Sequence, residues 1–105
     1  MKIAIPNNIT IGAFIAQVVI KDNLSGDDGY KGSYNQRTSE LNIDSALFGE
    51  IRDRVFLHEL MHVIALNYEV HLAEDDITRL ANGLYEFLMD AGIELDWCDI
   101  EVIEQ

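Results

Sequence analysis

Two histidines and a glutamate stand inside an apolar stretch near the middle of the chain, in the run VFLHELMHVIAL of residues 55–66. His58 and His62 are four residues apart, so on a helix both imidazoles lie on one face, one turn apart, where their nitrogens can converge on a single ion. Glu59 points aside from that axis. The pattern H-E-x-x-H is typical of zinc proteases, in which two neutral imidazoles hold the metal and the carboxylate serves the water beside it.

A structural role is the alternative interpretation of the two histidines. Partly buried, hydrogen-bonded histidines also occur on helix flanks, and a five-residue pattern can arise by chance. Apolar neighbours such as Val55 and Ile64 favour the metal, because polar side chains among them lack partners unless a ligand engages them. The sequence therefore predicts that His58 and His62 bind Zn²⁺.

A catalytic zinc site needs a third protein ligand and leaves one position open. The candidates are His71, Glu74, Asp75 and Asp76. His71 precedes the second predicted helix. At about 100° per residue, Asp75 lies opposite the apolar stripe of that helix, whereas Glu74 and Asp76 flank the stripe. The longer reach of Glu74 favours it, but periodicity alone does not separate Glu74 from Asp76.

The chemistry predicted for such a site is zinc-dependent hydrolysis of a peptide bond in a polypeptide substrate. Zinc would lower the pKa of its bound water towards about 7 and polarise the substrate carbonyl. Glu59 would act as the catalytic base and return the proton to the leaving amine. His71, Tyr68 and Tyr85 are candidates for an additional electrophile, although each also has a structural interpretation, such as helix packing for Tyr85.

Two helices are predicted to position these residues. Apolar residues recur about every 3.6 positions over residues 45–67, which predicts a helix that carries both histidines and that Asp44 or Ser45 caps. A second helix is predicted over residues 73–90, with three acidic residues in its first turn, where the helix dipole favours negative charge, and with Gly92 beyond its end. Its predicted apolar face consists of Ile77, Leu80, Ala81, Leu84 and Leu88.

Short strands are predicted before the first helix. The run 9–20, rich in β-branched residues, predicts a strand bent at Gly12 and closed by the turn formers of KDNLSGDDG, with helix as the alternative. Alternation of period two on both sides of a polar turn at 35–38 predicts a β-hairpin. Its second arm, SELNID, is either an inner strand or an open edge to which a substrate strand can add.

The predicted fold class is α+β, with residues 1–105 as one domain. A small antiparallel or mixed sheet, made by the N-terminal strand and the hairpin of residues 1–43, would pack on the two helices. Residues 93–105 are predicted to form an acidic tail in which Trp97 and Cys98 add satellite core rather than site residues.

The composition restricts the partners. Nineteen acidic residues against seven basic residues give a formal net charge of −12, which disfavours nucleic acid and anionic membrane surfaces. The apolar run 9–20 is too short to span a bilayer. Cys98, the lone cysteine, permits no intrachain disulfide and fits a reduced compartment. The sequence therefore predicts a cytoplasmic protein that binds neither nucleic acid nor membrane.

The runs LHELMH and EDDITRLANGLYEFL, joined by a short link, resemble the small zincin-type metallopeptidases of phages and prophages, which are related to the gluzincin class. The resemblance covers residues 30–90 and implies a minimal zincin-like domain, Zn²⁺ as the cofactor and the bacterial host cytoplasm as the location. In that class the ligand glutamate opens the second helix, six residues before a [FL]-A pair, which implies Glu74 before Leu80 and Ala81. One departure is Thr78, where larger gluzincins often carry an aspartate that supports a histidine.

Two other functions are compatible with the sequence. In a non-catalytic zinc-binding interaction module of phage or prophage origin, the same three ligands would hold together two helices of a small domain. An acidic protein that blocks a basic partner would depend on the net charge alone. Glu59 favours the enzyme, because a structural zinc site has no use for a carboxylate beside its ligands.

Overall fold

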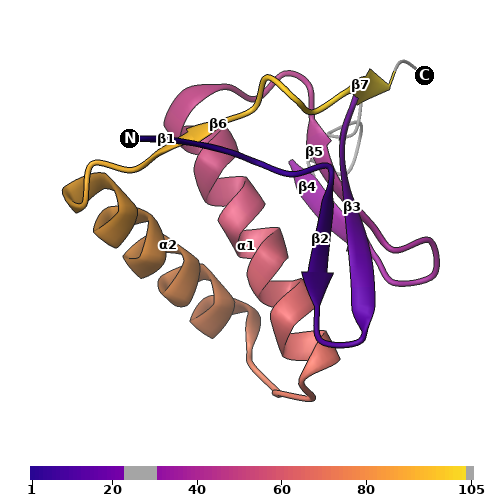
Figure 1. Cartoon of the computed structure of the whole chain (residues 1–105). Coiled ribbons are helices and arrows are strands. Elements are labelled where there is room, and N and C mark those ends of the chain that lie inside the picture. The colour runs from indigo at the N-terminus through magenta and orange to yellow at the C-terminus, as the bar shows by residue number, and fades with distance from the viewer. Residues whose placement is uncertain (23–30, 104–105) are drawn as a thin grey trace.

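The computed structural model describes residues 1–22 and 31–103, so most of the predicted turn KDNLSGDDG lies outside the described residues. The fold is α+β, as predicted: helix α1 lies between a mixed sheet and helix α2 (Figure 1). The helices are α1 (Gly49–Asn67) and α2 (Glu74–Asp90), and the strands are β1 (Lys2–Ala4), β2 (Asn8–Ile11), β3 (Phe14–Lys21), β4 (Gly32–Asn35), β5 (Glu40–Asp44), β6 (Glu94–Asp96) and β7 (Val102–Ile103).

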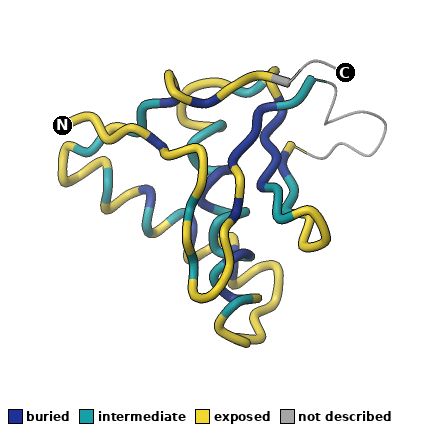
Figure 2. The backbone as a smooth tube through the Cα atoms, turned by 45° about the vertical axis from the view of Figure 1, so that its right-hand side comes forward, coloured by how far each residue is buried: buried dark blue, intermediate teal, exposed yellow. Residues whose placement is uncertain are grey.

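The main sheet has the strand order β2-β3-β5-β4, and β7 also pairs with β3. Strands β3 and β5 are parallel, whereas the hairpin partners β2–β3 and β4–β5 are antiparallel. Buried residues concentrate on β3 and β5, while α2 is exposed over most of its surface (Figure 2). No helix in the described part of the chain is long and apolar enough to cross a membrane.

The N-terminal run is a β-hairpin rather than one bent strand. Ile11 pairs with Phe14, which leaves a two-residue turn between β2 and β3. Gly12 has a φ of 60° in this turn. A residue without Cβ adopts this left-handed conformation readily, and a reversal here replaces the predicted bend.

The second predicted hairpin is confirmed, and its second arm is an inner strand. β4 and β5 pair around the polar turn, with Gly32 opposite Ile43. β5 lies between β3 and β4, and its Leu41 and Ile43 side chains are fully buried. The interpretation of SELNID as an open edge is therefore wrong, and the free edge on this side of the described sheet belongs to β4.

Helix α1 begins at Gly49, four residues after the predicted start, and neither Asp44 nor Ser45 caps it. The Asp44 carboxylate accepts a hydrogen bond from the Ala46 N–H at 2.7 Å, and the Asp44 carbonyl accepts one from the Leu47 N–H at 3.1 Å. The Ser45 hydroxyl instead donates to Asp22 at 2.5 Å. Asp44 therefore stabilises a turn before the helix, because its side chain satisfies a nearby backbone N–H.

Helix α2 begins at Glu74, one residue inside the predicted bounds, and ends at Asp90 as predicted. Its buried residues are Ile77, Ala81 and Tyr85. Leu80 is 50% exposed, so its predicted place on the buried face is wrong. The helix packs chiefly on α1, and this neighbour covers a narrower face than the sequence pattern offers.

The described part of the predicted acidic tail, residues 93–103, belongs to the folded structure. β6 pairs in parallel with β1, and β7 pairs in parallel with β3. Trp97 is buried and meets Phe56 of α1 edge to face, with ring centroids 5.2 Å apart. Ile100 is also buried, whereas Cys98 is exposed and adds nothing to the core. Residues 93–103 belong to the fold because two of their apolar side chains, Trp97 and Ile100, are buried in the core.

Candidate metal centre

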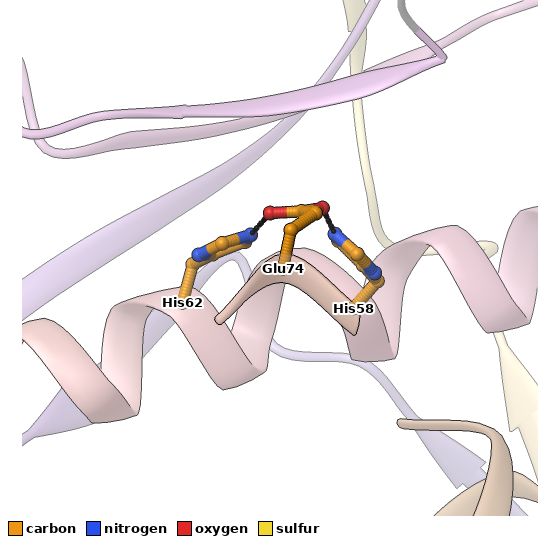
Figure 3. A group of neighbouring side chains, drawn as sticks. All are labelled: His58, His62 and Glu74. Atoms are coloured by element: carbon orange, nitrogen blue, oxygen red, sulfur yellow. Dashed lines mark ion pairs between the residues drawn. The ribbon is translucent and has the colours of Figure 1, made fainter. Parts of the chain in front are cut away.

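The three predicted ligands come together where the first turn of α2 passes over the middle of α1. Figure 3 shows the two imidazoles projecting from α1 with the Glu74 carboxylate lying between them. The Glu74 oxygens are 2.5 Å from His58 Nε2 and 3.0 Å from His62 Nε2. The donor atoms of all three residues lie within 4.8 Å of one another, which is the proximity that one shared ion requires.

The end of α1 explains how Glu74 reaches this position. Glu69 has a φ of 57°, and the Val70 N–H donates to the Ala65 carbonyl at 2.8 Å. The Glu69 N–H also points back, to the Leu66 carbonyl at 3.4 Å. This is a Schellman end, in which one left-handed residue reverses the chain after a helix. The short link that follows therefore places the first residue of α2 beside the histidines.

The other candidates for the third ligand lie elsewhere. In residues 1–22 and 31–103, the group that can hold a metal consists of His58, His62 and Glu74. Asp76 instead pairs with Arg79 on its own helix, at 3.3 Å. His71 is exposed in the link and borders a separate hollow that it shares with His62. The geometry thus distinguishes Glu74 from Asp76 and His71, which helical periodicity did not.

Thr78 supplies the hydrogen-bond partner that the sequence left unassigned. Its hydroxyl donates to the Glu74 carbonyl at 3.1 Å, and its oxygen lies 3.4 Å from His58 Nδ1. Since the hydroxyl proton is used by the carbonyl, the oxygen can accept a hydrogen bond from His58 Nδ1. An imidazole that binds a metal ion through Nε2 carries its proton on Nδ1, so this contact would suit a metal-bound His58.

Glu59 is outside the ligand group and faces the space around it. Two hollows flank the ligands: the His58 hollow, of about 340 Å³, and the His62 hollow, of about 650 Å³. Glu59 and Glu74 border both of them. Burial raises the pKa of the Glu59 carboxyl above its usual range, the two histidines act in the opposite direction, and Glu74 adds to the rise.

Gly32 lets the free edge of β4 approach the site closely. A Cβ at this position would lie 2.6 Å from Val55 Cγ1 and 3.2 Å from Glu59 Cγ. Gly32 also borders both hollows, so the two follow β4 on either side of Glu59. The sequence showed Gly32 only as part of the hairpin alternation, because its contact with α1 depends on the packing of elements that are separate in the sequence.

The three candidates for an additional electrophile lie outside the ligand group. Tyr85 is buried beneath the Arg54 guanidinium, which lies 4.5 Å from the ring centroid, as expected for a packing residue. Tyr68 is exposed, and its ring lies against Gly12 of the β2–β3 turn. His71 borders a further hollow, which it shares with His62.

Comparisons with protein families, with curated proteins and with solved structures found no match for this chain. The chemistry of the site therefore has to be argued from its own side chains. Two imidazole nitrogens and one carboxylate form a donor set that suits zinc and is used in hydrolytic sites. The convergence of His58, His62 and Glu74, with Nε2 of His58 free of the Thr78 contact, fits such an ion.

Proposed function

We propose that the protein is a zinc-dependent metallopeptidase of the small zincin type that its motifs resemble. The observation that carries the proposal is the position of Glu59, a carboxylate that is absent from the ligand group and yet borders the hollows on both sides of it. His58, His62 and Glu74 would hold the ion. A site that served only to join α1 to α2 would gain nothing from Glu59.

The side chains divide the work of peptide hydrolysis. Zinc, when bound, supplies Lewis-acid chemistry: it activates water and polarises a carbonyl group. Glu59 would accept the proton that the attacking water loses and donate it to the leaving amine. The burial that raises the pKa of Glu59 suits both steps, because a carboxyl group that titrates closer to neutral pH both accepts and returns a proton effectively. Thr78 would hold His58 in the tautomer that binds the ion.

We place the proposed substrate along the free edge of β4. An edge strand presents backbone N–H and C=O groups that an extended polypeptide can pair with. A chain added along β4 would pass the His58 hollow, Glu59 and the His62 hollow in turn. We therefore propose an extended polypeptide substrate that pairs with β4 rather than with the inner strand β5. From the resemblance of the motifs, we also propose the bacterial cytoplasm as the location.

A non-catalytic zinc-binding interaction module is the second candidate function. One observation favours it: two ligands come from α1 and the third opens α2, so an ion would join the helices of a chain with a small core. Both candidates predict zinc binding, and both predict that His58→Ala removes the metal. They differ in what Glu59 does.

The substitution Glu59→Gln separates the two candidates, because it keeps the size of the side chain and removes the proton acceptor. Zinc content and melting temperature should change little, since Glu59 is outside the ligand group. Cleavage of peptides in a bacterial lysate by the zinc-loaded protein should fall by about 10² to 10⁴, the usual contribution of general acid–base catalysis. The measurement is mass spectrometry of the lysate peptides. Wild-type protein that binds zinc but yields the same peptides as Glu59→Gln would exclude peptidase activity on that lysate and favour the module.

A further inference from the structure

We infer that the His58 hollow is a subsite that binds a carboxylate of the substrate polypeptide. The inference rests on the proposed peptidase function and names the chemistry that the site selects. The hollow is bordered by His58, Glu59 and Thr78 of the metal centre and by two cations, Lys31 and Arg54.

Lys and Arg residues are scarce in this chain, and in its described part they border one of the two hollows beside β4 but not the other. Seven Lys and Arg residues stand against nineteen acidic residues in the chain, whereas the His58 hollow is bordered by two cations and two acidic residues. The described residues that line the His62 hollow include Ser33, Tyr34, Gln36 and Leu66 but no Lys or Arg. An extended substrate would therefore meet cations on the His58 side of Glu59 and neutral side chains on the other side.

Arg54 is held in a fixed orientation and keeps donors for a ligand. Its guanidinium lies over the Tyr85 ring and donates through Nη1 to the Asn82 amide oxygen at 2.7 Å. Nε and Nη2 contact one oxygen of Glu50, at 2.9 and 2.8 Å. A guanidinium has five N–H donors, so two remain on the terminal nitrogens. Glu50 is exposed, so solvent screens this pair and its attraction is weak.

Lys31 brings a second charge that no residue of the ranges 1–22 and 31–103 pairs with. Its carbonyl accepts the Asp44 N–H at 3.0 Å, which ties the residue to the end of β5. Its exposed side chain makes no hydrogen bond or ion pair with any residue in the described ranges 1–22 and 31–103. The acidic residues on the same hollow are Glu59 and Glu74, and zinc would offset the charge of Glu74 when the carboxylate binds it.

The chemistry that matches this hollow is a carboxylate. An oriented guanidinium forms paired, charge-assisted hydrogen bonds with a carboxylate, and an ammonium group nearby adds attraction without a fixed direction. A polypeptide offers this group in two places, on an Asp or Glu side chain and at its C-terminus. Either would lie on the Lys31 side of the bond that is cleaved.

The test uses random-sequence decapeptides with free or amidated C-termini. Binding is measured on immobilised, zinc-loaded Glu59→Gln protein, and cleavage is measured with the wild-type protein, both by mass spectrometry. Peptides with Asp or Glu on one side of the cleaved bond, or with a free C-terminus there, should be preferred about tenfold, the value of one good charged contact. A preference that survives amidation assigns the subsite to acidic side chains, and one that amidation removes assigns it to the terminal carboxylate.

Charge variants decide whether Lys31 and Arg54 cause the preference. Lys31→Glu should shift the preference from acidic to basic residues, and Arg54→Gln should abolish it. Lys2→Gln, on β1 and outside both hollows, removes one positive charge, as Arg54→Gln does, and should leave the preference unchanged. Arg54 also contacts α2, so a melting curve checks that the Arg54→Gln protein is folded. If it is not folded, Lys31→Glu still decides the test, because the Lys31 side chain is exposed.

The outcomes separate the subsite from the proposed function. Peptides that are cleaved with no acidic preference would overturn the subsite and leave the peptidase standing. Peptides that bind with the preference but remain uncleaved would support the subsite and contradict the peptidase. A Lys31→Glu variant that keeps the wild-type preference would overturn the inference outright.

Discussion

Thr78 shows how one hydroxyl group can prepare a histidine for a metal ion. It lies one helical turn after Glu74, so the same turn of α2 supplies the third candidate ligand and a contact to the first, His58. His62 has no comparable partner at Nδ1 among the hydrogen bonds of the described residues. The two imidazoles therefore differ in their hydrogen-bond contacts. His58, the one that Thr78 contacts, is also the one that borders the His58 hollow.

Thr78→Val should weaken zinc binding while leaving the fold intact. Valine has nearly the same shape but lacks the oxygen that accepts from His58 Nδ1, and loss of such a partner usually costs about 10- to 100-fold in metal affinity. Because Thr78 is exposed, the melting temperature of the metal-free protein should hardly change. Competition with a chromophoric chelator measures the affinity. Thr78→Ser keeps the hydroxyl and should bind zinc like the wild type, and equal affinity in the Val variant would remove Thr78 from the site.

The residues of the candidate site differ in how far the sequence predicts them. The spacing of His58 and His62 is a property of one helix, so periodicity alone places them on one face. The choice of Glu74 over Asp76 depends on how the Schellman end after α1 directs α2, which involves an ordinary residue, Glu69, in a left-handed conformation that sequence patterns assign to glycine. Helical periodicity does not signal the Thr78 contact, because it crosses between two helices, and only the resemblance to gluzincins marked this position as one that can support a histidine.

At the scale of elements, the close approach of β4 and α1 sets the shape of the site. The strand lies against the helix at Gly32, where there is no room for a side chain beside Val55. That approach brings the backbone of the free edge strand next to the Glu59 side chain. A wider spacing would move the strand away from the carboxylate and leave a proposed substrate out of its reach.

Gly32→Ala should destabilise the protein and lower the proposed peptidase activity. The new Cβ would lie 2.6 Å from Val55 Cγ1, so strand or helix must shift, at a cost of about 1–3 kcal/mol. The lower entropy of the unfolded alanine chain offsets about 0.4–1 kcal/mol of this. Val55→Ala removes the clashing methyl groups, so the double variant should be more stable than the sum of the single changes predicts. Urea unfolding of the four proteins measures the coupling, and strict additivity would contradict the proposed clash.

At the scale of the whole molecule, the two ends of the chain close the fold. β6 pairs with β1 and β7 with β3, so residues from the last quarter of the chain complete both sheets. The sequence predicts the two helices and the β4–β5 hairpin because their patterns are local. It does not predict these parallel pairs, because they join segments far apart in the sequence and the acidic residues of 93–103 obscure the few apolar positions. Trp97 anchors this segment on α1.

Asp53 of α1 links this helix to Trp97 in the segment 94–103 and should give the stability of the protein a distinct dependence on pH. Its carboxylate accepts the Trp97 Nε1–H at 2.8 Å, and burial raises its pKa, an effect that the Trp97 hydrogen bond and nearby Arg52 reduce but do not cancel. A carboxyl group with a folded pKa above the unfolded value, which is about 3.9, binds protons more tightly when folded. Its contribution to stability is therefore complete below that unfolded value and is lost as the pH rises through the folded pKa.

Asp53→Asn tests this linkage, because asparagine keeps an oxygen for Trp97 but does not titrate. Measured by urea unfolding of the metal-free proteins, the variant should be at least as stable as the wild type at neutral pH, and its advantage should shrink or reverse as the pH falls through the folded pKa of Asp53. Other carboxylates titrate in both proteins and cancel in the difference. Asp53→Leu leaves the Trp97 N–H without its acceptor and should cost about 1–3 kcal/mol at every pH. An advantage of Asp53→Asn that grows on acidification would mean that the hydrogen bond from Trp97 outweighs burial at this carboxyl.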